Sequence, residues 1–300
     1  MRNTAFLFAV LIVMGAGWGI TLPLTKIAVS EGYRQFGLIF WQMAIGAVLM
    51  GALVAATGRT LPRHKAALKT YVIIALIGTV VPGAASFQAA VYLPAGILSI
   101  LLSLVPMLAL PIALALGNDR FQPRRLLGLA LGGVAVLLIA APEASLPDPA
   151  MLAFLPLALI APLFYAFEGN YVSRWGTAGL DAVQVMAGAS LVGVVITLPL
   201  AVLSGQWIDP RPPWGLPDAA HVASAVIHAA VYTTYVWLVG RAGAVFAAQV
   251  AYLVTGFGVF WAMLLLGERY SLWVWAAFGV MLVGLTLVQP RPRVDQETDL

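Results

Sequence analysis

The composition of this 300-residue chain excludes an ordinary soluble domain. Hydrophobic residues make up 62% of the chain and charged residues only 9%, and the mean hydropathy is +0.96, whereas roughly a quarter of the residues in a soluble domain are charged. The chain has no cysteine, which excludes disulfides, iron–sulfur clusters and thiol catalysis. The net charge of +4 does not indicate nucleic-acid binding, because the basic residues lie between hydrophobic runs. The composition therefore predicts a membrane protein.

Apolar runs of membrane-spanning length cover nearly the whole sequence. A spanning helix needs about 20 mostly apolar residues, and ten such runs follow one another. They lie near residues 5–26, 36–56, 70–91, 95–116, 124–142, 151–172, 183–204, 219–239, 244–266 and 271–289. Between the third and fourth runs, Pro94 and Gly96 predict a turn. The runs do not alternate polar and apolar residues, so we expect an all-α membrane protein and not a β-barrel.

The positions of the basic residues predict the orientation in the membrane. With ten helices both termini lie on the same side, and that side would hold twelve of the 16 Lys and Arg residues. The other side would hold only Lys26, Arg34, Arg211 and Arg269. Since loops rich in Lys and Arg stay in the cytoplasm, we expect both termini to be cytoplasmic. Lys26, at the end of the first run, is expected to extend toward the outer interface.

The sequence also carries an internal repeat. Residues 92–121 align with residues 241–270 at a constant offset of 149, which pairs Asp119 with Glu268. Two spans rich in Leu and Ala can align by chance, but both segments end in an acidic residue, an Arg and an aromatic residue, which favours a true repeat. An odd number of helices per half places the second copy upside down, an arrangement typical of secondary transporters. The predicted units are 1–142, 151–289 and a flexible cytoplasmic tail at 290–300.

Three motifs in this order resemble one family of carriers. They are "WGITLPLTKIA" at 18–28, "SLVPMLALPIALALGNDRF" at 103–121 and "LLLGERYSLWVWAAFGVMLVG" at 264–284. Together they resemble the EamA branch of the drug/metabolite transporter superfamily. The resemblance implies two inverted five-helix repeats in a bacterial inner membrane, and within the family the chain looks most like the YddG-like amino-acid exporters. Asn118-Asp119, Thr255 and Trp41-Gln42 depart from the family pattern, which leaves the substrate class open.

Ionisable and aromatic residues at mid-membrane depth are the candidate substrate site. An acid inside a bilayer is costly and usually faces a cavity or a partner, so Glu168 either binds substrate or protons or pairs with Arg174. Residues His228, Tyr232 and Tyr235 share one face of a helix, where they either line a cavity or pack. The full set, on five predicted spans, is Trp18, Thr21, Gln88, Tyr92, Tyr165, Glu168, His228, Tyr232, Tyr235, Gln249 and Tyr252.

The sequence indicates a carrier and not an enzyme. It contains no H-E-x-x-H, P-loop or G-x-S-x-G motif, so we expect neither catalysis nor a metal or cofactor. The expected activity is export of aromatic and neutral amino acids, or similar small metabolites, by alternating access. The alternatives are a carrier of another metabolite or drug-like compound, such as a cation or nucleoside, and a non-transport intramembrane enzyme. The expected partners are the substrate and the lipid bilayer, without nucleic acid, for a monomeric protein.

Overall fold

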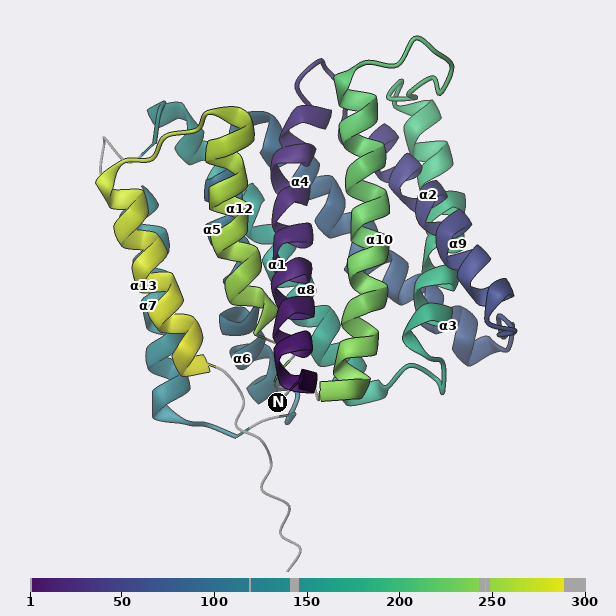
Figure 1. The fold of residues 1–300 in the computed structure, drawn as a ribbon, viewed down its shortest axis with the longest axis horizontal. Coiled ribbons are helices and arrows are strands. Elements are labelled where there is room, and N and C mark those ends of the chain that lie inside the picture. The colour runs from purple at the N-terminus through teal and green to yellow at the C-terminus, as the bar shows by residue number, and fades with distance from the viewer. Residues whose placement is uncertain (1, 119, 141–145, 243–245, 247–248, 289–300) are drawn as a thin grey trace, which may run out of the picture.

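The structure, a computed structural model, is built from helices. It describes residues 2–118, 120–140, 146–242, 246 and 249–288, and every regular element within them is helical (Figure 1). The sequence-based expectation of an all-helical protein is confirmed. The predicted repeat pair Asp119 with Glu268 and the predicted tail 290–300 fall wholly or partly outside the described residues.

The described residues of the first half form eight helical segments. They are α1 (Arg2–Ala28), α2 (Gln35–Ala56), α3 (Lys65–Ala75), the π-helical η1 (Leu76–Val80), α4 (Val81–Tyr92), α5 (Ala95–Leu102), α6 (Val105–Ala115) and α7 (Pro123–Ala140). Segments α3, η1 and α4 follow one another without a gap. The expected turn is present, because α4 ends at Tyr92 and α5 begins at Ala95.

The described elements of the second half are also helical. Its elements are the 3₁₀-helix η2 (Pro149–Phe154), α8 (Leu155–Trp175), α9 (Ala182–Leu203), α10 (Leu216–Ala242), α12 (Val250–Leu266) and α13 (Leu272–Val288). An Asp181 capping box starts α9: its carboxylate accepts from the Gln184 backbone N–H while the Gln184 side chain accepts from the Asp181 N–H. Such a box satisfies two backbone donors that a helix start leaves free.

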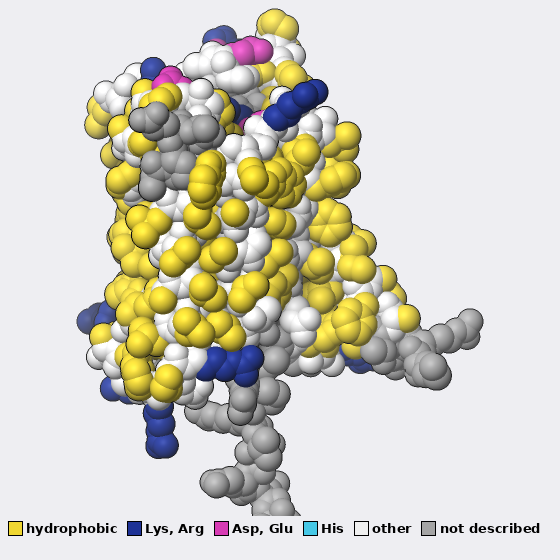
Figure 2. All heavy atoms as spheres, turned by 90° about the vertical axis from the view of Figure 1, so that its left-hand side faces the viewer, with side chains coloured by type: hydrophobic (Ala, Val, Ile, Leu, Met, Phe, Trp, Pro, Cys, Tyr) yellow, Lys and Arg dark blue, Asp and Glu magenta, His cyan; other side chains and the backbone are white. Residues whose placement is uncertain are grey.

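Several segments are long and apolar enough to cross a membrane. Among the described residues there are seven, namely Ala5–Ala28, Gln35–Ala56, Lys65–Tyr92, Ala95–Ala115, Pro123–Ala140, Pro149–Trp175 and Ala182–Leu203. Two shorter apolar helices, α12 and α13, have 17 residues each. Figure 2 shows apolar side chains covering the middle of the α7–α13 face, with charged side chains gathered at its two ends. Exposed Leu127, Leu137 and Leu272 belong to this apolar surface, whose extent indicates contact with lipid.

The two halves pack on each other through equivalent helices. The first helix, α1, packs against α10 and α12, and Figure 1 shows it between them. Its counterpart α8 packs in the same way against α4, α5 and α6 of the first half. Helices α2 and α9 form a second pair, and α7 and α13 a third. Reciprocal contacts of this kind are those of two similar units related by a twofold axis.

Glycines bring α1 close to α12. A Cβ atom built on Gly19 would lie only 2.8 Å from the backbone nitrogen of Gly258, so neither position has room for a larger side chain. The Ser99 hydroxyl of α5 donates to the Thr255 carbonyl of α12 at 3.2 Å. Small residues allow membrane helices to approach this closely. These contacts hold α1, α5 and α12 together as one layer.

Candidate functional site

Glu168 lies against the π-helical segment in the third span. Its carboxylate faces Gly78 of η1, and a Cβ atom built there would lie 2.5 Å from Glu168 Oε1 and 2.8 Å from its Cδ. Single π-turns within α-helical spans often mark functional positions. The acid therefore occupies space that exists only because residue 78 is a glycine.

The Glu168 carboxylate has no protein partner among the described residues. No hydrogen bond or ion pair joins it to them, and Arg174, the alternative partner considered from the sequence, is exposed at the end of α8. The acid acts electrostatically on the hydroxyl groups of two tyrosines, Tyr165 and Tyr232. A half-buried carboxylate without a partner is available to a substrate cation or a proton.

A second group of side chains extends this arrangement toward α1. The Trp18 ring lies 6.1 Å from the His228 ring and 5.5 Å from the Tyr235 ring, measured between centroids. Tyr235 and Tyr232 lie one turn apart on α10, and the charge of Glu168 acts on Tyr232. The Trp18 Nε1 atom is buried and has no hydrogen-bond partner among the residues that the structure describes. An unused indole N–H of this kind is costly to leave unpaired.

Six of the predicted residues thus form one group, which we call the central cluster. Its members are Trp18, Tyr165, Glu168, His228, Tyr232 and Tyr235, all of them half-buried. The cluster joins α1, α8 and α10, with η1 beside its acid. It offers an N–H donor, a carboxylate, phenol hydroxyls and aromatic faces. Such groups can bind an anion, a cation and an apolar group.

The structure shows other contacts for the remaining five predicted residues. The Thr21 hydroxyl donates to the Trp18 carbonyl of its own helix at 2.6 Å. Tyr92, the last residue of α4, stacks on Phe154 with ring centroids 3.7 Å apart. Gln88 is half-buried in α4, Gln249 is exposed immediately before α12, and Tyr252 packs against the main hydrophobic core. A role in substrate binding remains a prediction for all eleven residues.

Two features of the site were missed from the sequence. Gly78 carries no local signal, because a glycine in an apolar run is common and its contact with Glu168 joins positions 90 residues apart. In the sequence, Glu268 belongs to the repeat and to the motif at 264–284, and neither indicates its partners. In the structure its carboxylate accepts from the Ala95 and Gly96 backbone N–H groups at 2.7 and 3.1 Å. It thereby caps the start of α5.

Comparison with known proteins identifies the family. The EamA-like transporter family matches residues 5–141 and 153–289, and the chain belongs to this family. It carries two copies of the family's repeat, so the protein is a membrane transporter of small molecules. A solved structure titled "Crystal structure of protein" is similar over 95% of this chain and 97% of its own, with 17% identity and a TM-score of 0.61. No curated protein matches.

Proposed function

We propose that this transporter exports amino acids, aromatic and neutral ones above all, or closely similar metabolites. The observation that carries the proposal is the pair of unused polar groups in the central cluster. The Trp18 indole N–H lacks an acceptor, and the Glu168 carboxylate lacks a cation among the described residues. An amino acid supplies both groups, since its carboxylate accepts from the indole and its ammonium binds the acid.

The aromatic side chains of the cluster support an aromatic or apolar substrate. Rings of Trp18, Tyr232 and Tyr235 give a wall on which a substrate side chain can pack. They also favour an ammonium group held over a ring face. The resemblance to YddG-like exporters agrees with this substrate class.

The proposed mechanism is alternating access between two inverted five-helix halves. In support, α1 and α8 occupy equivalent places, each packed on the third and fourth spans of the opposite half. Inverted halves of this kind rock around a site near the bilayer midplane. We propose ten spans, both termini in the cytoplasm and residence in a bacterial inner membrane, in agreement with the distribution of Lys and Arg.

A carrier of organic cations is the second candidate. Glu168 favours it, because an unpartnered acid alone suffices to select an amine. The two candidates differ in the part of the substrate that meets Trp18. An amino-acid carrier needs the substrate carboxylate, whereas a cation carrier does not.

A counterflow assay in proteoliposomes tests the proposal. Vesicles loaded with unlabelled phenylalanine should take up labelled phenylalanine, and a panel of amino acids, amines and nucleosides as the unlabelled load ranks the substrates. Glu168→Gln should reduce exchange by about tenfold or more, because a neutral amide loses the charge-assisted bond to the ammonium. Gly169→Ala is the matched control, since a Cβ atom there meets nothing within 4 Å.

Three outcomes separate the candidates. Exchange of amino acids that Glu168→Gln impairs and Gly169→Ala preserves supports the proposal. Exchange of amines alone replaces it with the cation carrier. Absence of exchange for the whole panel, from protein that is folded by its melting curve, refutes both.

A further inference from the structure

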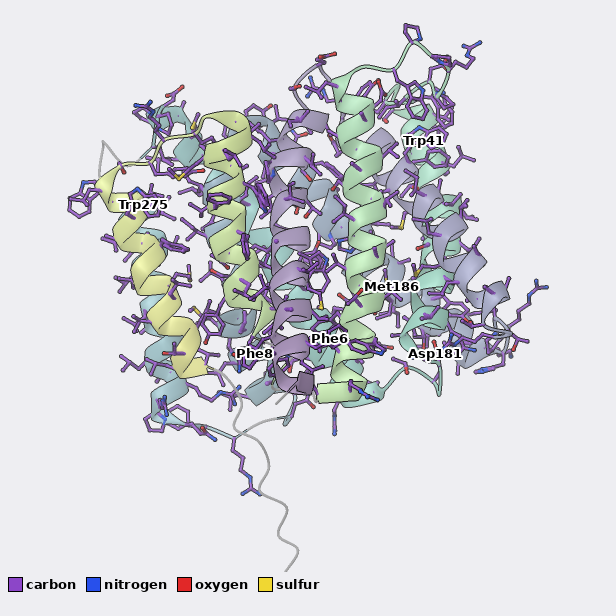
Figure 3. The ribbon with its side chains drawn as sticks, in the orientation of Figure 1. Phe6, Phe8, Trp41, Asp181, Met186 and Trp275 are labelled. Carbon is purple, nitrogen blue, oxygen red and sulfur yellow. The ribbon has the colours of Figure 1, made fainter. Side chains whose placement is uncertain are left out.

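A separate cavity lies at the end of the molecule opposite the N-terminus. It has a volume of about 230 Å³ and lies among α2, α10 and the connection between α9 and α10. The residues that matter here are Tyr33, Trp41, Ile208, Trp214, Asp218 and His221, and no member of the central cluster lines it. Figure 3 shows Trp41 at this end of the molecule, far from Phe6 and Phe8. We call this cavity the Trp41 pocket.

The carboxylate of Asp218 lines the Trp41 pocket, and that of Glu31 lies beside it. Asp218 accepts from the Tyr33 hydroxyl at 2.7 Å and from the Gly215 backbone N–H at 2.8 Å. Glu31 lies next to them, with its Oε2 atom 3.7 Å from a Cβ atom built on Gly215. The hydrogen bond to Asp218, partial burial and the charges of Asp218 and Glu31 raise the pKa of Tyr33 to about 12. The pocket mouth therefore has a negative local potential.

The nearby base Arg211 does not cancel this potential. Its guanidinium is paired with Asp209, two residues earlier in the same connection. Both side chains are largely exposed to solvent. Asp209 and Arg211 thus form a neutral unit, so the negative potential comes from Asp218, which lines the pocket, and from Glu31 beside it.

A buried histidine supplies an unused hydrogen-bonding atom. His221 lines the pocket and is only 6% exposed, and its Nε2 atom has no hydrogen-bond partner in the described part of the chain. The ring is held by a hydrogen bond to the Leu38 backbone and by contact with Phe87, whose ring centroid lies 5.8 Å away. When one nitrogen of a neutral imidazole donates, the other is an acceptor. An unpaired buried acceptor favours a ligand that donates.

The walls of the Trp41 pocket determine what apolar group a ligand can carry besides the hydrogen-bond donor. Tyr33, Trp41 and Trp214 are aromatic, and Leu38 and Ile208 are aliphatic. The Trp41 N–H is already bonded to the Ile208 carbonyl at 3.0 Å, so this ring offers its apolar surface. Aromatic faces attract ammonium groups as well as apolar bodies. The volume is below the roughly 300–1,000 Å³ of pockets for drug-sized ligands, which limits the ligand to about one ring.

We infer that the Trp41 pocket is a second binding site, for small organic amines that carry one apolar or aromatic group. The ammonium group binds between the carboxylates of Asp218 and Glu31 and the Nε2 atom of His221, and the apolar group packs on Trp41 and Trp214. This site is independent of the central cluster, because the two share no residue. In the proposed topology it opens to the outer face of the membrane.

Calorimetric titration of the full chain in lipid nanodiscs tests this site. The probes are 2-phenylethylamine, the neutral 2-phenylethanol and the anionic 3-phenylpropionate, all with one ring. The titration uses the Glu168→Gln variant, which lacks the acid of the central cluster, so that binding at the central cluster does not interfere. We expect one site for the amine and at least about tenfold weaker binding of the alcohol and the acid, because neither brings a cation.

Variants of the pocket locate the site. Asp218→Asn, Glu31→Gln and His221→Leu should each weaken amine binding by about threefold to tenfold, since each removes one acceptor. Asp209→Asn is the matched control, because that acid is paired with Arg211 on the exposed side. Glu31 is exposed, so its variant folds even where a change at Asp218 disturbs the start of α10.

Several results would overturn the inference. These are equal binding of amine and alcohol, amine binding that the Glu31 and Asp218 variants leave unchanged, and absence of amine binding to folded Glu168→Gln protein. A phospholipid that native mass spectrometry finds on the wild type and not on Trp214→Ala would instead make the pocket an acyl-chain site. Loss of exchange by Glu168→Gln with retained amine binding separates this site from the proposed transport function.

Discussion

Lys26 and Glu268 bind the two sides of one helix corner. The Lys26 Nζ atom donates to the Ala90 carbonyl at the end of α4 at 2.7 Å, and the Glu268 carboxylate accepts from the Ala95 N–H at the start of α5 at 2.7 Å. Each charge therefore lies at the helix end whose dipole it complements. The Tyr270 hydroxyl donates to the same carboxylate at 2.5 Å. The α4–α5 corner of the first half is thus fixed to the second half.

We predict that Glu268→Gln lowers the stability of the protein. The substitution replaces charge-assisted hydrogen bonds to two backbone N–H groups and to Tyr270 by weaker ones, at a cost of about 1–3 kcal/mol. The melting temperature of the purified protein in detergent should fall by several degrees. Arg269→Gln, a change of an exposed neighbour, should leave it unchanged. Equal melting temperatures for both variants would show that the cap contributes nothing.

Gly78 is predicted to be essential for transport. In Gly78→Ala the new methyl group would lie 2.5 Å from Glu168 Oε1, so the acid must move from its place in the central cluster. Exchange in proteoliposomes should fall by about tenfold or more, since small misplacements of a positioned group are costly. Gly51→Ala and Gly169→Ala, where a Cβ atom meets nothing within 4 Å, serve as controls.

A double substitution distinguishes this clash from general damage to the helix. Aspartate is one methylene shorter than glutamate, so Gly78→Ala with Glu168→Asp removes the clash. The double variant should exchange substrate at least as well as Glu168→Asp alone. The losses of exchange caused by the two substitutions would then not be additive. Additive losses would show that Gly78 acts through the backbone of η1 and not through the carboxylate.

The helices could be predicted from the sequence because their signal is local. Length and hydropathy suffice to find spans, and Pro94 marks the break between α4 and α5. The common face of His228, Tyr232 and Tyr235 follows from helical spacing, and the structure brings Tyr235 and His228 to the same Trp18 ring. Local periodicity therefore predicts which side chains share a face.

Contacts between distant segments could not be predicted in this way. The extension of Lys26 toward the outer interface stays a prediction, and no sequence pattern indicates that its amino group binds the last turn of α4. Tyr92 was grouped with the substrate site by spacing alone, and the structure stacks it on Phe154, 62 residues further along the chain. The π-helical turn beside Glu168 is likewise absent from any sequence pattern, since its hydrogen bonds differ from those of an α-helix only in register.

The ion pair of Asp181 with Arg59 makes part of the stability depend on pH. The two atoms, Asp181 Oδ2 and Arg59 Nε, are 2.8 Å apart, at the start of α9, where Figure 3 shows Asp181. Burial tends to raise the pKa of Asp181, but hydrogen bonds from the Gln184 backbone and from Arg59 outweigh it and lower that pKa below its ordinary value. A lowered pKa stabilises the folded protein above about pH 4, and this contribution is lost as the pH falls through the folded-state pKa.

Asp181→Asn tests this dependence while preserving the helix cap, because Asn also caps well. At pH 7 the variant should melt at a lower temperature, by an amount equivalent to less than about 1 kcal/mol, since both partners are substantially exposed. Toward pH 3 the difference between the two melting temperatures should shrink, because the wild-type carboxyl protonates as the pH falls through its lowered pKa. Melting curves at pH 7, 5 and 3 measure the difference in melting temperature between the two proteins. A difference that stays constant would show that the Asp181–Arg59 ion pair does not make the stability depend on pH.

The proposed topology predicts the side of the membrane on which each loop lies. Reporters at both termini and within 57–69, the loop that carries Arg59, Arg63, Lys65 and Lys69, should be cytoplasmic. A reporter within 205–218 should be on the opposite side. Labelling of single introduced cysteines with an impermeant reagent measures this without background, since the chain has no cysteine of its own. Termini on different sides would refute the ten-span arrangement.

Trp18→Phe should change which part of a substrate the transporter recognises. The substitution keeps an aromatic ring beside His228 and Tyr235 but removes the Nε1–H group, which is buried without a partner. If that group donates to the substrate carboxylate, its loss costs about 1–3 kcal/mol, or roughly ten- to a hundredfold in exchange of phenylalanine. Exchange of 2-phenylethylamine, which lacks the carboxylate, should change much less. Trp237→Phe, on the exposed surface of α10, should affect neither compound, and an equal loss of both in Trp18→Phe would assign Trp18 to packing.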